Sequence, residues 1–129
     1  MTAPRSPHET SPRHVEKPWG WELVWAETDA YVGKLLFVRA GESLSLQYHE
    51  TKDESWLVRE GRGTLELGEV DGDLEPTEIA PGDTFHFRPG TVHRLTALED
   101  TLVVEVSTPQ LDDVVRLDDA YGRQGTNAP

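Results

Sequence analysis

The 129-residue sequence contains no cysteine. This absence excludes a disulfide framework and any metal site built on thiolates. A metal ion bound by this chain would therefore need nitrogen and oxygen ligands, from imidazole, carboxylate or amide groups. Five histidines and 24 acidic residues are available to supply such ligands.

Long apolar runs are also missing, and the N-terminal stretch MTAPRSPHETSPRH lacks the apolar centre of a signal peptide. The sequence thus predicts a cytoplasmic protein without a membrane partner. Basic residues are scarce, because 12 stand against 24 acidic residues and the net charge is −12. Nucleic-acid binding relies on clustered Lys and Arg, so we expect no nucleic-acid partner. An anionic small molecule remains compatible, since a few local cations can outweigh the overall field.

The chain length fits one domain. Residues 1–14 are rich in Pro, Ser and Thr and offer little apolar surface to bury, so we expect a disordered tail there. Residues 15–129 are expected to form the single domain.

Short strand-like runs follow one another through this domain, separated by turn-forming pairs such as Glu60-Gly61 and Pro89-Gly90. The runs read WELVW, YVGKLLFVR, SLSLQYH, ESWLVRE, GTLELG, DTFHF, VHRLTAL and TLVVEVS. Many short strands without a long helical period predict an all-β sandwich or barrel. The C-terminal stretch LDDVVRLDDAYGR is expected to form a short segment, helical or extended.

Strand geometry brings polar residues together in two parts of the sequence. Side chains alternate faces on a strand, so Gln47 and His49 share one face. Residues 50–53 are short and polar enough to turn the chain back, which lets Glu54 converge on them. His93 follows a Pro-Gly turn at the head of another strand. Two imidazoles, one carboxylate and one amide oxygen would suit a divalent ion such as Zn, Mn, Fe, Ni or Co.

These two segments together resemble the cupin family. Its first motif has the pattern Gly, five residues, His-x-His, three or four residues, Glu, six residues, Gly. This pattern is matched from Gly41 to Gly61, with Gln47 in place of the first histidine. The second motif is matched at Gly82-Asp83, Pro89-Gly90 and His93. The resemblance implies a small double-stranded β-helix, also called a cupin or jelly-roll barrel.

A narrower resemblance accounts for the glutamine. The stretches KPWGWE, LSLQYH, PGTVHRL and DDVVRLDDAYGR look like the cupin domain that ends type II phosphomannose isomerases. In that group a Gln-x-His pair is normal, and phosphomannose isomerases in general use Gln, His, Glu and His around one divalent metal, usually zinc. By position, the resemblance implies the metal ligands Gln47, His49, Glu54 and His93.

The same resemblance implies a small-molecule substrate, a sugar or sugar phosphate, and an aldose–ketose isomerisation through an enediol. Such a reaction needs a Lewis acid for the developing negative charge and a proton carrier. The candidate catalytic residues are Lys52, His86 and Glu105. Lys52 stands where the type II enzymes carry arginine, so the charge is kept but the bidentate fork that fits phosphate is lost.

Three further residues are candidates for substrate binding. Trp56 shares a strand face with Glu54, and its indole could stack on a sugar ring. Arg116 and Arg123 lie in the C-terminal segment that fits the family's ending, and their charge suits a phosphate.

Two other functions stay open. His49, Glu54 and His93 also make a two-His, one-carboxylate set, which is typical of iron- or nickel-dependent oxygenases. Alternatively, the domain is a non-catalytic sugar-binding cupin in which the metal only fixes the barrel. Cupins often dimerise through outer strands, so we also expect a homodimer, to which KPWGWELVW would contribute.

Overall fold

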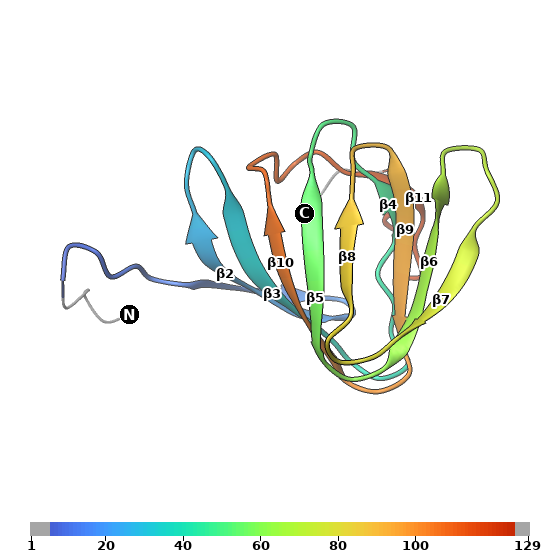
Figure 1. Ribbon diagram of the computed structural model, residues 1–129, viewed down its shortest axis with the longest axis horizontal. Helices are drawn as coiled ribbons and strands as arrows, with labels where there is room; N and C mark the ends of the chain where they lie inside the picture. Colours follow the sequence, from blue (N-terminus) through green and yellow to red (C-terminus); the bar gives the residue numbers. More distant parts are fainter. Residues whose placement is uncertain (1–5, 126–129) are drawn as a thin grey trace.

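The computed structural model describes residues 6–125. This part of the chain contains eleven β-strands and no helix, and its strands form two antiparallel sheets (Figure 1). The six-stranded sheet has the order β1-β2-β3-β10-β5-β8, and the five-stranded sheet has the order β11-β4-β9-β6-β7. The predicted all-β barrel of the cupin or jelly-roll type is confirmed.

The six-stranded sheet consists of β1 (Arg13–Lys17), β2 (Gly20–Glu27), β3 (Val32–Val38), β10 (Thr101–Ser107), β5 (Glu54–Glu60) and β8 (Thr84–Phe87). The five-stranded sheet consists of β11 (Val115–Asp118), β4 (Leu46–Tyr48), β9 (Thr91–Ala97), β6 (Gly63–Glu69) and β7 (Glu75–Ile79).

Buried positions recur at every second residue of the central strands, as a pleated strand requires. On β3 these positions hold Lys34, Leu36 and Val38, and on β10 they include Val103 and Glu105. The inward face of such a strand is therefore apolar at one end and charged at the other. The apolar ends pack into the core, which contains Trp19, Leu36, Val38, Leu44, Trp56, Val58, Leu65, Ile79, Phe87, Leu95, Ala97 and Val103. The charged ends face a cavity.

Two glycines of the predicted motifs make turns that other residues would strain. Gly61 joins β5 to β6 at a φ of 93°, and a Cβ there would lie 2.4 Å from the carbonyl oxygen of Asp100. Gly90 has a φ of 89°, and its N–H donates to the carbonyl oxygen of His49 over 2.7 Å. The left-handed conformation is accessible to glycine at little cost. The second turn therefore ties the start of β9 to the segment that follows β4.

The C-terminal segment is extended, which is one of the two alternatives that the sequence left open. β11 pairs with β4 and places Arg116 opposite Gln47. Val114 and Arg116 are buried, whereas Leu117 is exposed, so the segment follows the period of a strand. β4 has only three residues and gains a hydrogen-bonded neighbour from this pairing.

The N-terminal tail that we expect over residues 1–14 falls partly outside the described residues. Residues 6–12 form no strand, and β1 begins at Arg13. β1 is the edge strand of its sheet, but of the segment KPWGWELVW that we expect to contribute to a homodimer only Lys17 lies on β1, and the remainder reaches β2, which is paired on both sides within the chain. The homodimer stays a prediction. Within residues 6–125, no helix has the length and apolar character needed to cross a membrane.

Candidate metal centre

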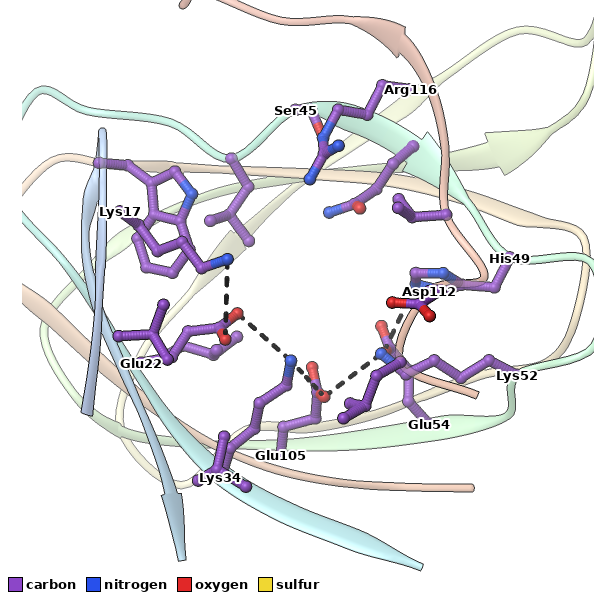
Figure 2. Close-up of a pocket in the computed structure, with 18 of the residues that line it drawn as sticks. Lys17, Glu22, Lys34, Ser45, His49, Lys52, Glu54, Glu105, Asp112 and Arg116 are labelled. Carbon is purple, nitrogen blue, oxygen red and sulfur yellow. Dashed lines mark hydrogen bonds and ion pairs between the residues drawn. The ribbon is translucent and has the colours of Figure 1, made fainter. Parts of the chain in front are cut away.

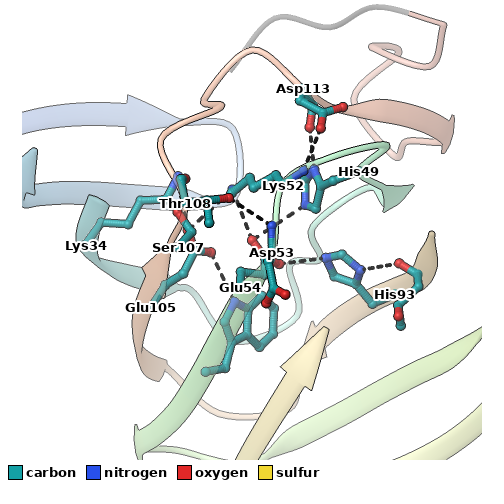
Figure 3. A network of polar contacts seen from close by, with 12 residues as sticks. Lys34, His49, Lys52, Asp53, Glu54, His93, Glu105, Ser107, Thr108 and Asp113 are labelled. Atoms are coloured by element: carbon teal, nitrogen blue, oxygen red, sulfur yellow. Dashed lines mark hydrogen bonds and ion pairs between the residues drawn. The ribbon is translucent and has the colours of Figure 1, made fainter. Parts of the chain in front are cut away.

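Three predicted ligands meet between the two sheets. Glu54 is the first residue of β5, His93 lies on β9, and His49 directly follows β4. Nε2 of His93 lies 3.1 Å from Oε1 of Glu54, and Nε2 of His49 lies 3.6 Å from Oε2. All three side chains are buried, and their ligating atoms lie within 4.8 Å of one another (Figure 3). Small side-chain movements would bring these atoms onto one ion.

Both imidazoles are oriented by backbone carbonyls. Nδ1 of His49 donates to the carbonyl oxygen of Asp113 over 2.5 Å, and Nδ1 of His93 donates to that of Thr91 over 3.0 Å. Nε2 faces Glu54 in both rings: it carries the lone pair and can bind a cation when the ring is neutral, and it donates to the carboxylate when the ring is protonated. Among the described residues, the buried Nε2 of His93 has no hydrogen-bond partner of good geometry, although Oε1 of Glu54 lies 3.1 Å away. Second-shell hydrogen bonds of this kind fix the tautomer of metal-binding histidines, so the cluster fits a divalent cation.

Gln47 is the fourth predicted ligand. It lies on β4 directly opposite His93 in the β4–β9 pairing, and its side chain lines the same cavity. The structure therefore brings all four predicted ligands to one region. The amide and the carboxylate would supply oxygen donors next to the two nitrogens.

Charged neighbours stabilise the ionised form of Glu54. Burial alone would raise the pKa of Glu54, but the two imidazoles and the Lys52 ammonium outweigh it and hold that pKa well below its ordinary value. Nζ of Lys52 lies 3.0 Å from Oε2 of Glu54 and 3.5 Å from Oε2 of Glu105. Burial lowers the pKa of Lys52, yet these two carboxylates raise it above its usual range. Lys52 is therefore a fixed cation beside the ligands.

Asp113 shapes the turn between His49 and Glu54. Its carboxylate accepts hydrogen bonds from three successive backbone N–H groups, those of Glu50, Thr51 and Lys52, at 2.6–2.9 Å. Burial raises the pKa of Asp113, but these donors outweigh it and lower the pKa. Because the carbonyl of Asp113 also holds His49, one residue of the C-terminal segment positions both the imidazole and Lys52. No local pattern in the sequence marks this role, since Asp113 lies 64 residues from His49.

The cluster opens into a cavity of about 250 Å³, just below the range of about 300–1,000 Å³ that is usual for pockets of drug-sized ligands. An alternating series of charges crosses the six-stranded sheet along one wall of this cavity (Figure 2). Successive members of the series are Lys17, Glu22, Lys34, Glu105, Lys52 and Glu54, with neighbouring charged atoms 3.0–4.0 Å apart. Among residues 6–125, six basic residues line the cavity, but only four of the more numerous acidic residues do.

Most of the other predicted site residues also line this cavity. Glu105 is buried on β10, and its Oε1 accepts a hydrogen bond of 3.0 Å from the indole N–H of Trp56. The Trp56 ring packs edge-on against Phe87 and His93. Trp56 therefore orients Glu105 and one imidazole, in addition to forming part of the wall.

Arg116 and Arg123 also line the cavity. Arg116 is buried on β11, and Arg123 holds Asp119 with Nε and a terminal nitrogen at 3.0 and 3.1 Å. Their place at the cavity agrees with the predicted substrate-binding role, which stays a prediction.

The structure does not bring His86 to the cavity. Its ring is 46% exposed, and Nε2 lies 2.7 Å from Oδ1 of Asp53. On β8 it pairs with Ser55, which alternates with the inward-facing Glu54 and Trp56. His86 therefore lies on the outer face of the sheet, and we do not retain it among the residues proposed for catalysis.

The cavity is also lined by three charged residues that the motifs do not mark, Lys17, Glu22 and Lys34. One signal was available for Lys34, because a lysine interrupts the apolar stretch VGKLLFV at a position that shares a face with Leu36 and Val38. A buried charge in such a place needs a partner or a function. Lys17 and Glu22 flank a turn, and alternation alone does not place them.

Two antiparallel sheets that enclose a cavity, with a His–Glu–His cluster in its wall, define the double-stranded β-helix class of protein. The chain belongs to the cupin family. A family model described as "Cupin domain" matches residues 34–108, which is more than half of the chain.

Several curated proteins are similar over most of this chain. It is 35% identical to the mannose-1-phosphate guanylyltransferase ManC of Salmonella typhimurium and 32% identical to the mannose-1-phosphate guanylyltransferase of Escherichia coli K12. Each match covers 86% of this chain and 23% of the relative. The chain thus spans less than a quarter of the length of these relatives.

Solved structures with the same fold include the capsular polysaccharide assembling protein CapF from Staphylococcus aureus. That match has a TM-score of 0.76 at 16% identity and covers 89% of this chain and 34% of CapF. KdgF from Halomonas sp. matches with a TM-score of 0.63 at 25% identity, over 78% of this chain and 89% of that one. Oxalate decarboxylase from Bacillus subtilis matches with a TM-score of 0.72 at 15% identity, over 82% and 30% of the two chains.

Proposed function

We propose that this cupin domain is a metal-dependent isomerase or epimerase of a sugar or sugar phosphate, with mannose 6-phosphate as the first substrate to test. The observation that carries the proposal is the donor set. Two imidazole Nε2 atoms face one buried carboxylate, while both Nδ1–H groups are committed to backbone carbonyls. The similar guanylyltransferases are named for mannose 1-phosphate, a sugar phosphate, which supports the substrate class.

The proposed metal ligands are Gln47, His49, Glu54 and His93. Zinc is the first choice, because two nitrogen and two oxygen donors suit it; Mn, Fe, Ni and Co are the alternatives. A neutral amide ligand leaves more positive charge on the ion than a second carboxylate would. When bound, such an ion supplies Lewis-acid stabilisation for the negative charge that develops on the sugar oxygens during enolisation.

The residues around the ligands supply the rest of the reaction. The Lys52 ammonium is held by two carboxylates and gives a fixed positive charge near the developing oxyanion. Glu105 is the proposed proton carrier between carbon 1 and carbon 2. Its Oε1 is engaged by Trp56, whereas Oε2 is buried between the ammonium groups of Lys52 and Lys34, at 3.5 and 3.6 Å. One oxygen is thus oriented by the indole, and the other would exchange its proton beside two cations.

The test is the conversion of mannose 6-phosphate to fructose 6-phosphate. We expect turnover with protein loaded with Zn²⁺ or Mn²⁺, loss of turnover after chelation, and recovery after the metal is added back. Glu105→Gln should lower kcat while the affinity for metal stays unchanged, because Glu105 is not a ligand in this proposal. Metal-loaded protein that is inert on all hexose phosphates would contradict the proposed function.

A second candidate function is an iron-dependent oxygenase. The observation that favours it is that His49, Glu54 and His93 by themselves form a two-His, one-carboxylate cluster, the ligand set of many non-haem iron oxygenases. Oxygen uptake by iron-loaded protein in the presence of a small organic acid or sugar would support this function. A third function, sugar binding without catalysis, would be indicated by ligand binding without turnover.

A further inference from the structure

The two sheets differ in the face that each turns away from the cavity. On the five-stranded sheet, the outward positions of β6 and β9 alternate with buried leucines. Facing pairs across these two strands are Thr64 with Thr96 and Glu66 with Arg94. Nε of Arg94 lies 2.8 Å from Oε1 of Glu66. This outer face is polar over both strands, as expected of a surface in contact with water.

The outer face of the six-stranded sheet is apolar over three neighbouring strands, β2, β3 and β10. Their outward positions alternate with residues that line the cavity. β2 contributes Trp21, Leu23 and Trp25 to the outer face, and β3 contributes Leu35 and Phe37. Trp21 stacks on Phe37, with the ring centroids 5.2 Å apart.

β10 and β5 extend this surface. β10 adds Leu102, Val104 and Val106, and β5 adds Leu57. We call the outward side chains of β2, β3 and β10, together with Leu57, the apolar face. Leu57, Val106 and the nearby Trp25 are 39–48% exposed. Residues 6–125 form no helix, and all their strands belong to the two sheets, so no third layer covers the apolar face (Figure 1).

The size of the apolar face suits a protein–protein interface. Four strands about 4.8 Å apart and about 23 Å long give it a flat area of about 440 Å². The shorter β1 and β8 border it and bring the flat area of the whole sheet to about 580 Å². A standard interface buries about 800 Å² of accessible surface on each partner, and side-chain relief makes accessible area larger than flat area. An apolar centre with polar borders is also the usual anatomy of an interface.

The register of the sheet makes the apolar face self-complementary. Leu23, Leu35, Val104 and Leu57 lie in one row across β2, β3, β10 and β5. A two-fold axis parallel to the strands, between β3 and β10, would place β2 of one copy over β5 of another and β3 over β10. Leu23 would then meet Leu57 of the second copy, and Leu35 would meet Val104. Every apolar residue of the row thus finds an apolar partner.

The two halves of the apolar face also differ in shape. The half over β2 and β3 carries three aromatic rings, and the ring of Trp25 covers Gly33, where a Cβ would lie 2.6 Å from a ring carbon. The half over β10, β5 and β8 contains a groove of about 440 Å³, lined in part by Leu57, Val104 and Val106. The same axis places the aromatic half of each copy over the groove of the other.

We propose that the apolar face binds a second copy of this chain, with the two six-stranded sheets packed face to face and β2 of each copy over β5 of the other. Aligned sheets pack in this way about 10 Å apart, with interdigitated side chains. The net charge of −12 opposes association, but the apolar face itself is uncharged. The predicted homodimer then forms through the face of the sheet and not through the edge strand β1. Because the cavity lies on the opposite side of this sheet, the proposal is independent of the proposed function.

The first experiment measures the association of the full chain by analytical ultracentrifugation, from micromolar to submillimolar concentrations. We expect a reversible dimer that becomes tighter as sodium chloride screens the repulsion between two acidic copies. Leu57→Glu should raise the dissociation constant of the dimer at least about 100-fold, because a two-fold interface contains each substituted residue twice. Leu117→Glu is the matched control, since it adds the same charge at a residue that is 45% exposed on β11 of the other sheet. This control should dimerise like the wild type.

Two results would overturn the proposal. One is wild-type protein that stays monomeric over the whole concentration series, which would leave the apolar face to a different partner. The other is a Leu57→Glu variant that has a wild-type circular dichroism spectrum and dimerises as tightly as the wild type. If Leu57→Glu does not fold, Val106→Lys takes its place, because Val106 is 48% exposed in the single chain. The same loss of dimer is expected of that variant.

A mixing experiment tests the direction of the two-fold axis. Leu23→Lys and Leu57→Glu should each be monomeric alone, because each buries an introduced charge against a leucine. An equimolar mixture should form a dimer, since the introduced lysine then faces the introduced glutamate while the unchanged Leu57 and Leu23 face each other. A mixture that stays monomeric would overturn the arrangement with β2 over β5.

Discussion

The two ends of the cavity are built in different ways. The metal-ligating end takes Gln47, His49 and Glu54 from one short stretch of sequence, and His93 joins them because β9 pairs with β4. The other end, which we call the cationic end, is lined by Lys17 from β1, Lys34 from β3, and Arg116 and Arg123 from the C-terminal segment. One end is therefore encoded largely by local spacing, and the other exists only once the chain has folded.

The two ends also differ in how their polar groups are satisfied. At the metal end, each imidazole is fixed by a backbone carbonyl and faces a carboxylate. At the cationic end, positive groups face one another across a shared carboxylate. The first arrangement fits a bound cation, whereas in the second Lys17 and Lys34 are compensated by Glu22 and Glu105 within the chain. Substitutions at the cationic end should therefore leave metal binding largely unchanged.

The largest expected effect is that of Glu54→Gln on metal binding. The amide removes the negative charge and directs N–H groups toward the imidazoles, so we expect the affinity for Zn²⁺ to fall by at least about 100-fold. The measurement is isothermal titration of chelator-treated protein. Glu66→Gln is the matched control, because Glu66 lies on β6 and pairs with Arg94 away from the cavity. Similar affinities for the two variants would contradict the assigned ligand set.

Asp113→Ala should have the next largest effect. Three backbone N–H groups of the 50–52 turn lose their acceptor, so Lys52 and the turn next to His49 lose their fixed positions, although the backbone carbonyl that holds His49 is kept. We expect Zn²⁺ affinity to fall about tenfold, as for other outer-shell partners of metal ligands. Asp113→Asn keeps one side-chain acceptor, so its Zn²⁺ affinity should fall less than that of Asp113→Ala. An Asp113→Ala variant with full affinity would show that the turn holds its shape unaided.

A smaller effect is expected from Asp119→Asn, and it should depend on pH. Burial raises the pKa of Asp119, but its bonds with Arg123 outweigh this and lower the pKa below its ordinary value. A lowered pKa stabilises the fold above the unfolded-state pKa of about 3.9 and ceases to do so as pH falls through the folded-state value. Urea unfolding should show the variant less stable by about 1–2 kcal/mol at pH 7. The difference should shrink below about pH 4.

The exposed Asp29 provides the control for this pH dependence. Asp29→Asn should change the free energy of unfolding little at any pH, because surface substitutions away from special features have small effects. A constant difference between Asp119→Asn and the wild type from pH 3 to pH 7 would contradict the ionic role of Asp119.

The smallest expected effect tests whether the two ends of the cavity act independently. Lys17→Met should leave Zn²⁺ affinity within about threefold of the wild type, since sites without shared partners act nearly independently. The measurement is the same zinc titration that is used for Glu54→Gln. A loss of metal affinity as large as that of Asp113→Ala would show that the two ends are coupled through the charges between them.

Much of the fold could be predicted from the sequence. The central strands carry alternating apolar residues and are bounded by Gly and Pro turns. Their existence and their order along the chain could therefore be predicted. The sequence pattern does not predict three strands, each of which lies at an edge of a sheet: β1, β7 and β11. β7 shows why, because four of its five residues are exposed and it contains Pro76. An exposed edge strand has little need of apolar side chains and leaves little pattern.

The candidate site could also be predicted in part from the sequence. The four proposed ligands follow from motif spacing and lie together, whereas His86 could not be placed from spacing alone. Spacing does not show which face of the sheet His86 occupies, because that depends on the register between β8 and β5. The register places His86 opposite Ser55, on the face away from Glu54. Asp113 and Lys17 could not be found, because long-range pairing brings both of them to the site.

The most direct test of the central claim is a crystal structure of the protein grown with Mn²⁺ and mannose 6-phosphate, with an anomalous difference map for the metal. The account predicts one anomalous peak among Gln47, His49, Glu54 and His93, with the sugar phosphate in the cavity beside it. A metal peak elsewhere, or a sugar phosphate bound outside this cavity, would contradict it.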